Sequence, residues 1–187
     1  MLEQEERYKI SEVQLKKILE ISQPLIEEMD MLDVSFYENG NNLYDLYKYI
    51  IRIRQKDTKK TLEIKNYNDD NTCLEGAINL DSIGDAVNFL SLMNLQPAIY
   101  LKRKREVRKF KGLKIFIDKF DIIDNYVEIE YQDSMDYIGE ILEFKSLCKI
   151  DGAKESLYGK IIHDKLKKDS KFKEIFDKKM KEIIQNL

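Results

Sequence analysis

Two pairs of acidic residues repeat at the two-residue period of a β-strand and are the clearest candidates for chemistry in this chain. Glu3 and Glu5 form the first pair, and Glu128 and Glu130 form the second. Alternate residues of a strand point to one face, so the carboxylates of each pair would lie about 6.6 Å apart and repel each other by roughly 2.5 kcal/mol at an effective dielectric constant of about 20. A cation would remove that repulsion.

The type of cation follows from the other ligands that the chain offers. Cys73 and Cys148 lie far apart without CxxC spacing, and His163 is the only histidine, so a zinc site is not expected. Any metal would be a hard ion bound by oxygen. The alternative for each acid pair is a solvated strand face with surface ion pairs, worth about 0–1 kcal/mol apiece.

Basic residues recur at the same period and would suit a ligand rich in phosphate oxygens, because guanidinium groups bind them with paired hydrogen bonds. The segment from Lys102 to Lys114 carries eight Lys or Arg against the single acid Glu106. It could instead be a solvated hairpin or a nonspecific nucleic-acid patch, although a net charge of −3 does not favour a protein that coats nucleic acid. Sorted by face, the charged candidates are Glu3, Glu5, Arg7, Lys9, Arg52, Arg54, Glu63, Lys65, Arg103, Arg105, Asp118, Glu128 and Glu130.

Most of the elements that must position these residues are strands. Alternation predicts strands at residues 3–10, 31–37, 44–55, 61–65, 99–107, 113–118 and 126–131, and a weaker one at 73–79. A helix is predicted from Ser11, which has capping-box spacing to Gln14, to about residue 22. Another is predicted at 81–93, ended by Gln96-Pro97, and helical segments close the chain, the longest at 156–184 with a break at Asp169-Ser170.

This pattern predicts an α+β fold with roughly eight strands, mostly antiparallel. One face would carry apolar residues that pack against the helices, namely Ile53, Leu62, Ile64, Ile117, Val127 and Ile129. The other face would carry the charged residues, and a closed sheet would turn it into a water-filled interior. We therefore expect a closed eight-stranded antiparallel β-barrel tunnel with helices packed outside.

The charged segments resemble, in order, the motifs of the CYTH superfamily, the triphosphate tunnel metalloenzymes, which includes class IV adenylyl cyclases and thiamine triphosphatases. Its opening E-x-E-x-K strand is similar to Glu3-Gln4-Glu5-Glu6-Arg7-Tyr8-Lys9-Ile10, with Arg7 at the lysine position. Its L-R-I-R, lysine-ended and K-x-R strands are similar to Ile51-Arg52-Ile53-Arg54, Thr61 through Lys65, and Arg103-Lys104-Arg105. Its D-x-V and F-V-E-I-E strands are similar to Asp118-Lys119-Phe120 and Tyr126-Val127-Glu128-Ile129-Glu130.

The resemblance covers about Leu2 to Leu166 and implies a tunnel that binds a triphosphate along its axis. It implies that Glu3, Glu5, Glu128 and Glu130 hold Mg²⁺ or Mn²⁺, that Arg52, Arg54, Lys65, Arg103 and Arg105 bind the phosphates, and that Arg7, Lys9 and Asp118 serve catalysis. Asp118 would bind metal or orient a basic neighbour. Besides Arg7 at the lysine position, two departures are Asp124, where the family has glycine, and Glu75, which stands where the family has an acid pair.

The expected function is a divalent-metal-dependent enzyme that converts ATP to cyclic AMP and pyrophosphate, or a triphosphatase acting on ATP, thiamine triphosphate or tripolyphosphate. The segment from Asp118 to Glu130 favours the cyclase slightly. A non-catalytic module that binds polyphosphate or nucleotide is the alternative. For Glu63, an ion pair with Lys65 and a ligand role stay equally open.

The remaining expectations concern the chain as a whole. No Pro-, Gly- or Ser-rich stretch divides it, so residues 1–187 are expected to form a single domain. No apolar run reaches the roughly 18 residues of a membrane span, and no signal-peptide apolar region is evident, so a cytoplasmic location is the default. The sequence leaves open whether two copies form a homodimer.

Overall fold

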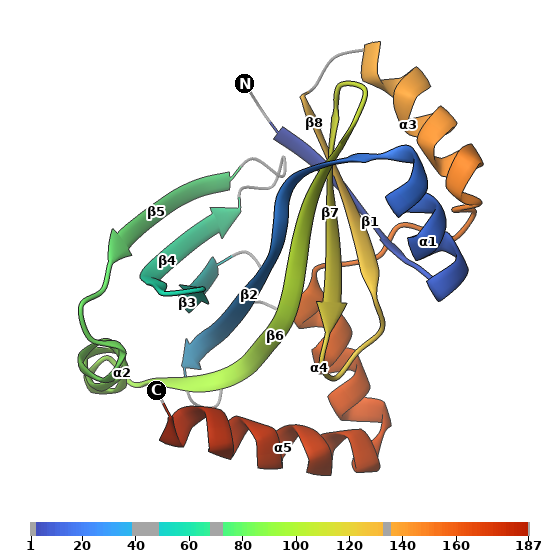
Figure 1. The fold of residues 1–187 in the computed structure, drawn as a ribbon. Helices are drawn as coiled ribbons and strands as arrows, with labels where there is room; N and C mark the ends of the chain where they lie inside the picture. Colours follow the sequence, from blue (N-terminus) through green and yellow to red (C-terminus); the bar gives the residue numbers. More distant parts are fainter. Residues whose placement is uncertain (1–2, 39–48, 68–72, 133–135, 187) are drawn as a thin grey trace. The chain divides into compact units, whose positions relative to one another are not determined.

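The computed structural model describes residues 3–38, 49–67, 73–132 and 136–186, which form eight strands and five helices (Figure 1). In chain order these elements are β1 (Glu3–Lys9), α1 (Glu12–Ile21), β2 (Gln23–Glu38), β3 (Tyr49–Lys56), β4 (Lys59–Tyr67), β5 (Cys73–Asn79), α2 (Ile83–Leu92), β6 (Leu95–Phe110), β7 (Leu113–Phe120), β8 (Tyr126–Gln132), α3 (Asp136–Cys148), α4 (Tyr158–Lys168) and α5 (Ser170–Gln185). The α+β class expected from the alternating pattern is confirmed.

The eight strands form one sheet in the order β1-β8-β7-β6-β2-β3-β4-β5. The pairs β1–β8, β8–β7, β7–β6, β2–β3, β3–β4 and β4–β5 are all antiparallel. The first and the last strand along the chain, β1 and β8, are therefore direct neighbours in the sheet. The predicted antiparallel sheet is confirmed, and its closure into a barrel stays a prediction.

The chain divides into two compact units. The first unit contains Met1–Asp30 and Arg103–Ser156, and the second contains Met31–Lys102 and Leu157–Leu187. The long strands β2 and β6 contribute residues to both units. A single domain over residues 1–187 stays a prediction.

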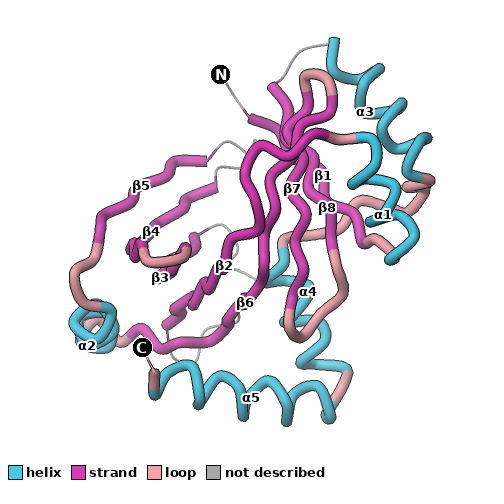
Figure 2. Tube along the Cα trace, viewed as in Figure 1, coloured by secondary structure: helices cyan, strands magenta, loops and turns pink. Residues whose placement is uncertain are grey.

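The first unit has a sheet with one apolar face. That face packs on helices α1 and α3, whose traces lie beside β1 and β8 in Figure 2. Its core includes Ile115 and Ile117 of β7, Val127 and Ile129 of β8, and Phe144 of α3, all 0% exposed. Burying side chains of this size stabilises the fold by roughly 1.5–3 kcal/mol each. The predicted packing of Ile117, Val127 and Ile129 against helices is confirmed.

Both ends of α1 are fixed by specific hydrogen bonds. At its start, the Ser11 hydroxyl accepts from the Gln14 backbone at 3.3 Å while the Gln14 side chain accepts from the Ser11 backbone at 2.8 Å, which is the predicted capping box. At its C-terminal end, the buried Arg108 of β6 donates to the carbonyls of Leu19 and Ser22 at 3.0 and 2.6 Å. These carbonyls would otherwise lack helical partners, so Arg108 joins the helix to the sheet.

The second unit contains β3, β4, β5 and helices α2, α4 and α5, with parts of β2 and β6. Val34 and Phe36 of β2 and Ile53 of β3 are buried. The ring of Tyr100 on β6 stacks on Phe176 of α5, with centroids 4.8 Å apart. Ile64 of β4 remains 38% exposed, so the apolar face predicted to pack against helices is only partly covered at this strand.

Tight turns join β3 to β4 and β6 to β7. Asp57 and Lys111, with φ of 50° and 51°, adopt the left-handed conformation in these turns. Beside Lys111, a Cβ on Gly112 would lie 2.5 Å from the ring of Tyr137, so a larger residue there would require this ring to move. The turns set the register that places Arg52 opposite Glu63 and Arg105 opposite Asp118.

Two strands begin earlier than predicted. β2 starts at Gln23 rather than at residue 31, and β6 starts at Leu95 rather than at residue 99. Pro97 therefore lies within β6 and does not end α2. That helix ends at Leu92, and the chain turns at Asn94, whose φ is 62°.

The predicted break between the last two helices is confirmed. α4 ends at Lys168, and the Asp169 side chain accepts a hydrogen bond from the Phe172 backbone at 2.9 Å to start α5. Residues 39–48, which include most of one predicted turn and the start of the following predicted strand, lie outside the described residues. Within the described ranges, no helix has the combined length and apolar character needed to span a membrane.

Candidate functional site

The first unit carries a charged cluster on the sheet face opposite its helices. We call it the first cluster, and its members are Glu5 and Arg7 of β1, Arg103 and Arg105 of β6, Asp118 of β7, and Glu128 of β8. The strand register places them together, because Arg7 lies opposite Glu128 and Arg105 lies opposite Asp118. Side chains directly opposite each other in antiparallel strands are about 5 Å apart at Cβ.

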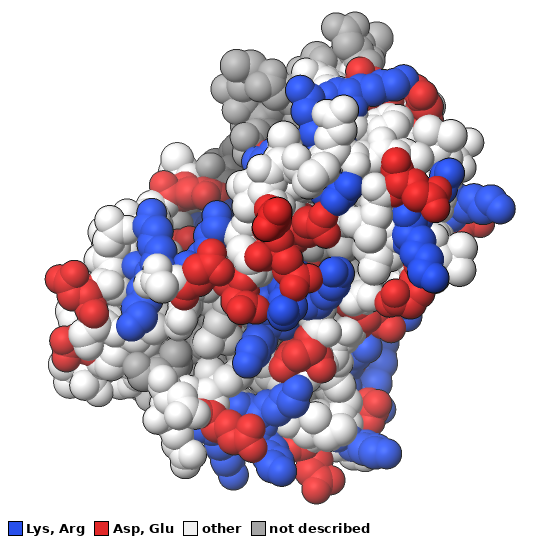
Figure 3. Space-filling view, in the orientation of Figure 1, with Lys and Arg blue, Asp and Glu red and all other residues white. Residues whose placement is uncertain are grey.

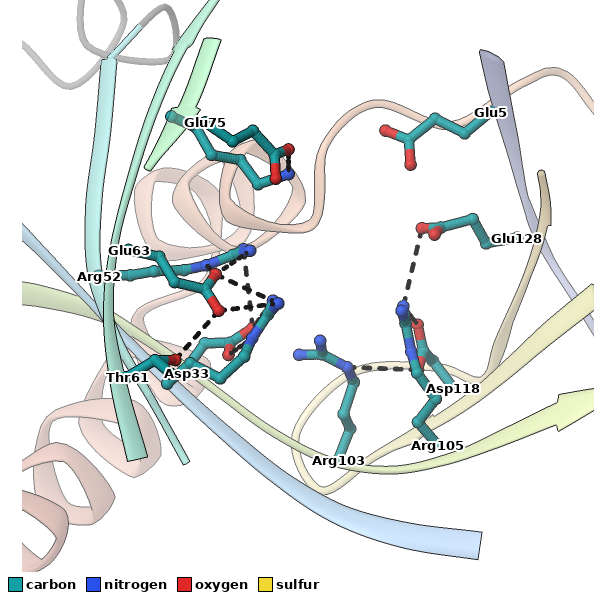
Figure 4. A network of polar contacts seen from close by, with 12 residues as sticks. Glu5, Asp33, Arg52, Thr61, Glu63, Glu75, Arg103, Arg105, Asp118 and Glu128 are labelled. Atoms are coloured by element: carbon teal, nitrogen blue, oxygen red, sulfur yellow. Dashed lines mark hydrogen bonds and ion pairs between the residues drawn. The ribbon is translucent and has the colours of Figure 1, made fainter. Parts of the chain in front are cut away.

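Asp118 is the buried anion of the first cluster. Its side chain is 0% exposed, and Arg105 donates from Nε and Nη2 to its two oxygens at 2.6 and 2.5 Å. Arg103 Nε lies 3.2 Å from Asp118 Oδ1. Figure 4 shows Arg103 joined to this carboxylate by a dashed line from its Nε, with Arg105 beside the same carboxylate. Of the two roles left open for Asp118, these contacts favour the orientation of basic neighbours.

Arg7 connects the two predicted acid pairs. It donates from Nε to Glu128 at 2.8 Å and from Nη2 to Glu5. Glu128 has a side chain only 6% exposed. Burial raises the pKa of Glu128 above that of an ordinary carboxyl, and the negative charges of Glu5 and Asp118 act in the same direction, while Arg105 and Arg7 oppose it.

The other predicted residues of β1 and β8 are placed less centrally. Glu130 lies opposite Glu5 and forms an ion pair with Lys114 at 2.8 Å. Lys9, with a side chain 55% exposed, pairs with Asp124 at 2.9 Å. The departure at Asp124 thus supplies a partner for Lys9. Glu3 lies in β1, but its side chain is outside the described part of the structure.

An aromatic ring lies among these charges. Phe116 of β7 faces Glu128 across the strand pair. The Arg105 guanidinium lies 4.6 Å from the centroid of its ring, and the Lys114 ammonium lies 4.8 Å away. Such contacts are worth about 0.5–1 kcal/mol at exposed sites and more when desolvated, so Phe116 helps to fix both cations.

The second unit carries its own charged cluster, which we call the second cluster. It consists of Asp33 of β2, Arg52 and Arg54 of β3, and Thr61 and Glu63 of β4. Arg54 donates to both oxygens of Asp33 at 2.6 and 3.0 Å. Arg52 donates to Glu63 Oε2 at 2.8 Å, and Arg54 Nη1 lies 3.2 Å from the same oxygen. Figure 4 shows Asp33, Arg52 and Glu63 converging.

Lys65, predicted to bind phosphate, lies on the same strand as Glu63 but has a different partner. It pairs with Glu75, which is opposite it on β5. Glu63 instead contacts Arg52 and Arg54. The Glu63–Lys65 ion pair left open by the sequence is therefore not the arrangement adopted.

The first cluster and its neighbour Glu130 offer part of the donor set that Mg²⁺ or Mn²⁺ requires. Glu5, Glu128 and Glu130 supply the oxygen ligands that hard cations prefer, and they share one sheet face. Among the described residues, no three acidic, histidine or cysteine side chains converge as a ready-made metal site. These carboxylates therefore have the ligand type that such a metal needs and lie on the same face of the sheet. Two of them, Glu5 and Glu128, are engaged in contacts with Arg7.

The basic segment from Lys102 to Lys114 does not form one exposed surface. Arg103 and Arg108 are only 4% and 8% exposed, and both contact groups within the first unit. On the face shown in Figure 3, acidic and basic side chains lie interspersed. These observations do not favour a nonspecific nucleic-acid patch in this segment.

Two residues of the second cluster, Asp33 and Thr61, and Lys114 beside the first cluster were not identified from the sequence. Asp33 was the most visible signal, because it is the lone charged residue in the largely apolar predicted strand at 31–37. Thr61 donates to Glu63 at 3.1 Å, and Lys114 was noted only as the end of the basic segment. Their importance depends on cross-strand neighbours, which the sequence does not specify.

The fold is shared with solved structures that resemble the chain only weakly in sequence. No protein-family model matches the chain, and no curated protein matches it in sequence. A conserved hypothetical protein from Pyrococcus furiosus aligns with a TM-score of 0.67 at 20% identity, over 84% of this chain and 98% of that one.

Two further structures carry descriptions of activity. A candidate adenylate cyclase from Vibrio parahaemolyticus aligns with a TM-score of 0.64 at 16% identity, over 87% of this chain and 98% of that one. HpAC1 of Hippeastrum, a candidate adenylyl cyclase described as having a dominant triphosphatase activity, aligns with a TM-score of 0.58 at 14% identity, over 80% of this chain and 88% of that one. At 20% identity or less, these likenesses show a shared fold, which agrees with the resemblance of the motifs to the CYTH superfamily.

Proposed function

We propose that this protein is a divalent-metal-dependent enzyme that acts on a triphosphate, either by converting ATP to cyclic AMP and pyrophosphate or by hydrolysis. The observation that carries the proposal is the first cluster, in which three arginines and three carboxylates share one face of an antiparallel sheet. The fold likeness to a candidate cyclase and to a protein with triphosphatase activity supports the same substrate class.

The charge of the first cluster supports a metal requirement. Its three guanidinium groups and three carboxylates cancel, if all are ionised, so the cluster offers no net positive charge to a polyanion. A triphosphate carries several negative charges, and its binding would be opposed by the carboxylates unless a cation accompanied it. Glu3, Glu5, Glu128 and Glu130 are the proposed metal ligands.

In this proposal, catalysis is mainly electrostatic. Arg7, Arg103 and Arg105 would donate hydrogen bonds to phosphate oxygens and stabilise the charge that develops on the leaving group. Asp118 would hold Arg103 and Arg105 in place, and Lys9 would add positive charge at the end of β1. Mg²⁺ or Mn²⁺ would neutralise phosphate oxygens as a Lewis acid.

The reaction depends on which phosphorus meets the nucleophile. In a cyclase the ribose 3′-hydroxyl attacks the α-phosphorus and pyrophosphate leaves, whereas in a hydrolase water attacks and releases phosphate. We favour the cyclase slightly, because the segment from Asp118 to Glu130 resembles that branch. Closure of the sheet into a barrel, and phosphate binding by Arg52, Arg54 and Lys65, are part of this proposal.

One experiment tests the reaction. The protein is incubated with Mg²⁺ or Mn²⁺ and ATP, tripolyphosphate or thiamine triphosphate, and the products are separated by chromatography. Cyclic AMP with pyrophosphate identifies a cyclase, and orthophosphate identifies a hydrolase. If none of the three compounds were bound or converted with either metal, the proposal would be wrong.

The second candidate is a non-catalytic module that binds polyphosphate or nucleotide. The observation that favours it is the double contact of Arg7 with Glu5 and Glu128, which engages two proposed metal ligands in an internal ion-pair network. In the same experiment, tight binding without product would identify such a module.

A further inference from the structure

Glu63 contacts three other members of the second cluster, Arg52, Arg54 and Thr61. Its carboxylate accepts from Arg52 Nε at 2.8 Å and from Thr61 at 3.1 Å, and lies 3.2 Å from Arg54 Nη1. One carboxylate thus lies between the guanidinium groups of two residues proposed to bind phosphate. Carboxylate and phosphate oxygens accept from arginine in the same way, so the two acceptors would compete for these donors.

Asp33 holds Arg54 in a different manner and lies 3.9 Å from Arg52 Nη1. Both of its oxygens accept from Arg54 Nε and Nη2 at 2.6 and 3.0 Å, and its side chain is 1% exposed. A buried carboxylate cannot leave a guanidinium without a large desolvation cost. Asp33 is therefore a fixed partner, which sets the orientation of Arg54.

Glu63 is more accessible than Asp33. Its side chain is 16% exposed, and those of Arg52 and Arg54 are 14% and 21% exposed. A ligand arriving from solvent can therefore reach the contacts made by Glu63 before those made by Asp33. The Glu63 carboxylate also has a shorter path back into water.

We infer that Glu63 is a built-in competitor that a polyphosphate must displace from Arg52 and Arg54, whereas Asp33 remains bound and positions Arg54. This inference rests on the proposed triphosphate function and adds a determinant of affinity to it. The two acids carry the same charge beside the same arginines, but Glu63 would oppose polyphosphate binding and Asp33 would support it.

The test measures the dissociation constant of tripolyphosphate by calorimetry, with and without Mg²⁺, for the full-length wild type and single variants. Glu63→Gln removes the competing charge and should tighten binding about tenfold, or ~1.4 kcal/mol. Asp33→Asn should weaken binding about tenfold, because Arg54 loses its orienting partner. Glu28→Gln is the matched control, since Glu28 is on β2 but pairs with Lys104 and Lys119 in the first unit, and it should leave binding unchanged.

Opposite shifts of the Asp33 and Glu63 variants would support the inference. Tightening by both would mean that only the loss of negative charge matters, and would overturn it. Unchanged or weaker binding by Glu63→Gln would also overturn it while leaving the proposed function intact. Failure of the wild type to bind tripolyphosphate would remove the proposed function and, with it, this inference.

A second variant covers the case in which Glu63→Gln does not fold. Thr61→Val keeps the side-chain shape but removes the hydrogen bond to Glu63. It should tighten binding two- to threefold, because the competitor is held less firmly. Weaker binding by this variant would contradict the displacement of Glu63.

Discussion

Replacing Asp118 by asparagine should destabilise the protein severely. The carboxylate is 0% exposed and makes contacts at 2.6 and 2.5 Å with Arg105 and at 3.2 Å with Arg103. Hydrogen bonds to charged groups contribute roughly 1.5–3 kcal/mol each. Two of these contacts go to Oδ1 and one to Oδ2, so asparagine, which retains one acceptor oxygen, loses at least one contact, and two guanidinium groups lose their buried counter-charge.

The expected cost is therefore about 3–5 kcal/mol in the free energy of unfolding, which is the range found when one partner of a buried ion pair is removed. The total free energy of unfolding of a native protein is roughly 5–15 kcal/mol, so the loss would be a large fraction of it. The loss should be measured by urea denaturation of wild type and variant at pH 7. A lower urea midpoint with an unchanged dependence of the unfolding free energy on urea concentration reports a loss of stability.

Glu28→Gln provides the comparison for an accessible acid in the same unit. Glu28 pairs with Lys104 and Lys119 at 2.9 Å, but its side chain is 37% exposed, so removal of its charge should cost no more than about 1 kcal/mol. If Asp118→Asn lowered stability by as little as Glu28→Gln does, the argument that Asp118 organises the two arginines would be wrong.

Three further predictions concern the first cluster. Glu130→Gln should abolish metal-dependent turnover while circular dichroism stays native, and full activity in this variant would contradict the metal assignment. Arg105→Ala should weaken tripolyphosphate binding at least tenfold in calorimetry, because a charged donor is lost; an unchanged affinity would exclude a phosphate-binding role. Burial raises the pKa of Glu128 in the folded state, so its ionisation costs stability as pH rises from below the unfolded carboxyl pKa. Glu128→Gln should therefore match the wild type in strong acid and become progressively more stable than it toward neutral pH, whereas a constant difference in urea midpoints would contradict the raised pKa.

The two-residue period was enough to predict which side chains share a sheet face. Arg52 and Arg54 do lie on the face of Glu63, and Ile117 and Val127 do lie on the apolar one. The reason is geometric, because alternation in a strand depends only on local backbone conformation. The capping box at the start of α1 is local in the same sense.

Partners across strands could not be predicted in this way. The sequence offered Lys65 as a partner for Glu63, but the sheet places Arg52 opposite Glu63 and Glu75 opposite Lys65. Strand order decides these neighbours, and strand order results from packing of the whole chain. Asp33 was overlooked for the same reason, since its value comes from Arg54 on the adjacent strand.

The tight turns at Asp57 and Lys111 have a consequence for how the chain can vary among relatives. Inserting or deleting one residue in a strand next to either turn would shift the pairing by one position and exchange the charged face of that strand for its apolar face. Arg52 or Arg105 would then point away from its carboxylate partner, although no cluster residue had been substituted. Segment length between these turns and the clusters is therefore expected to be preserved more strictly than the identity of the residues in between.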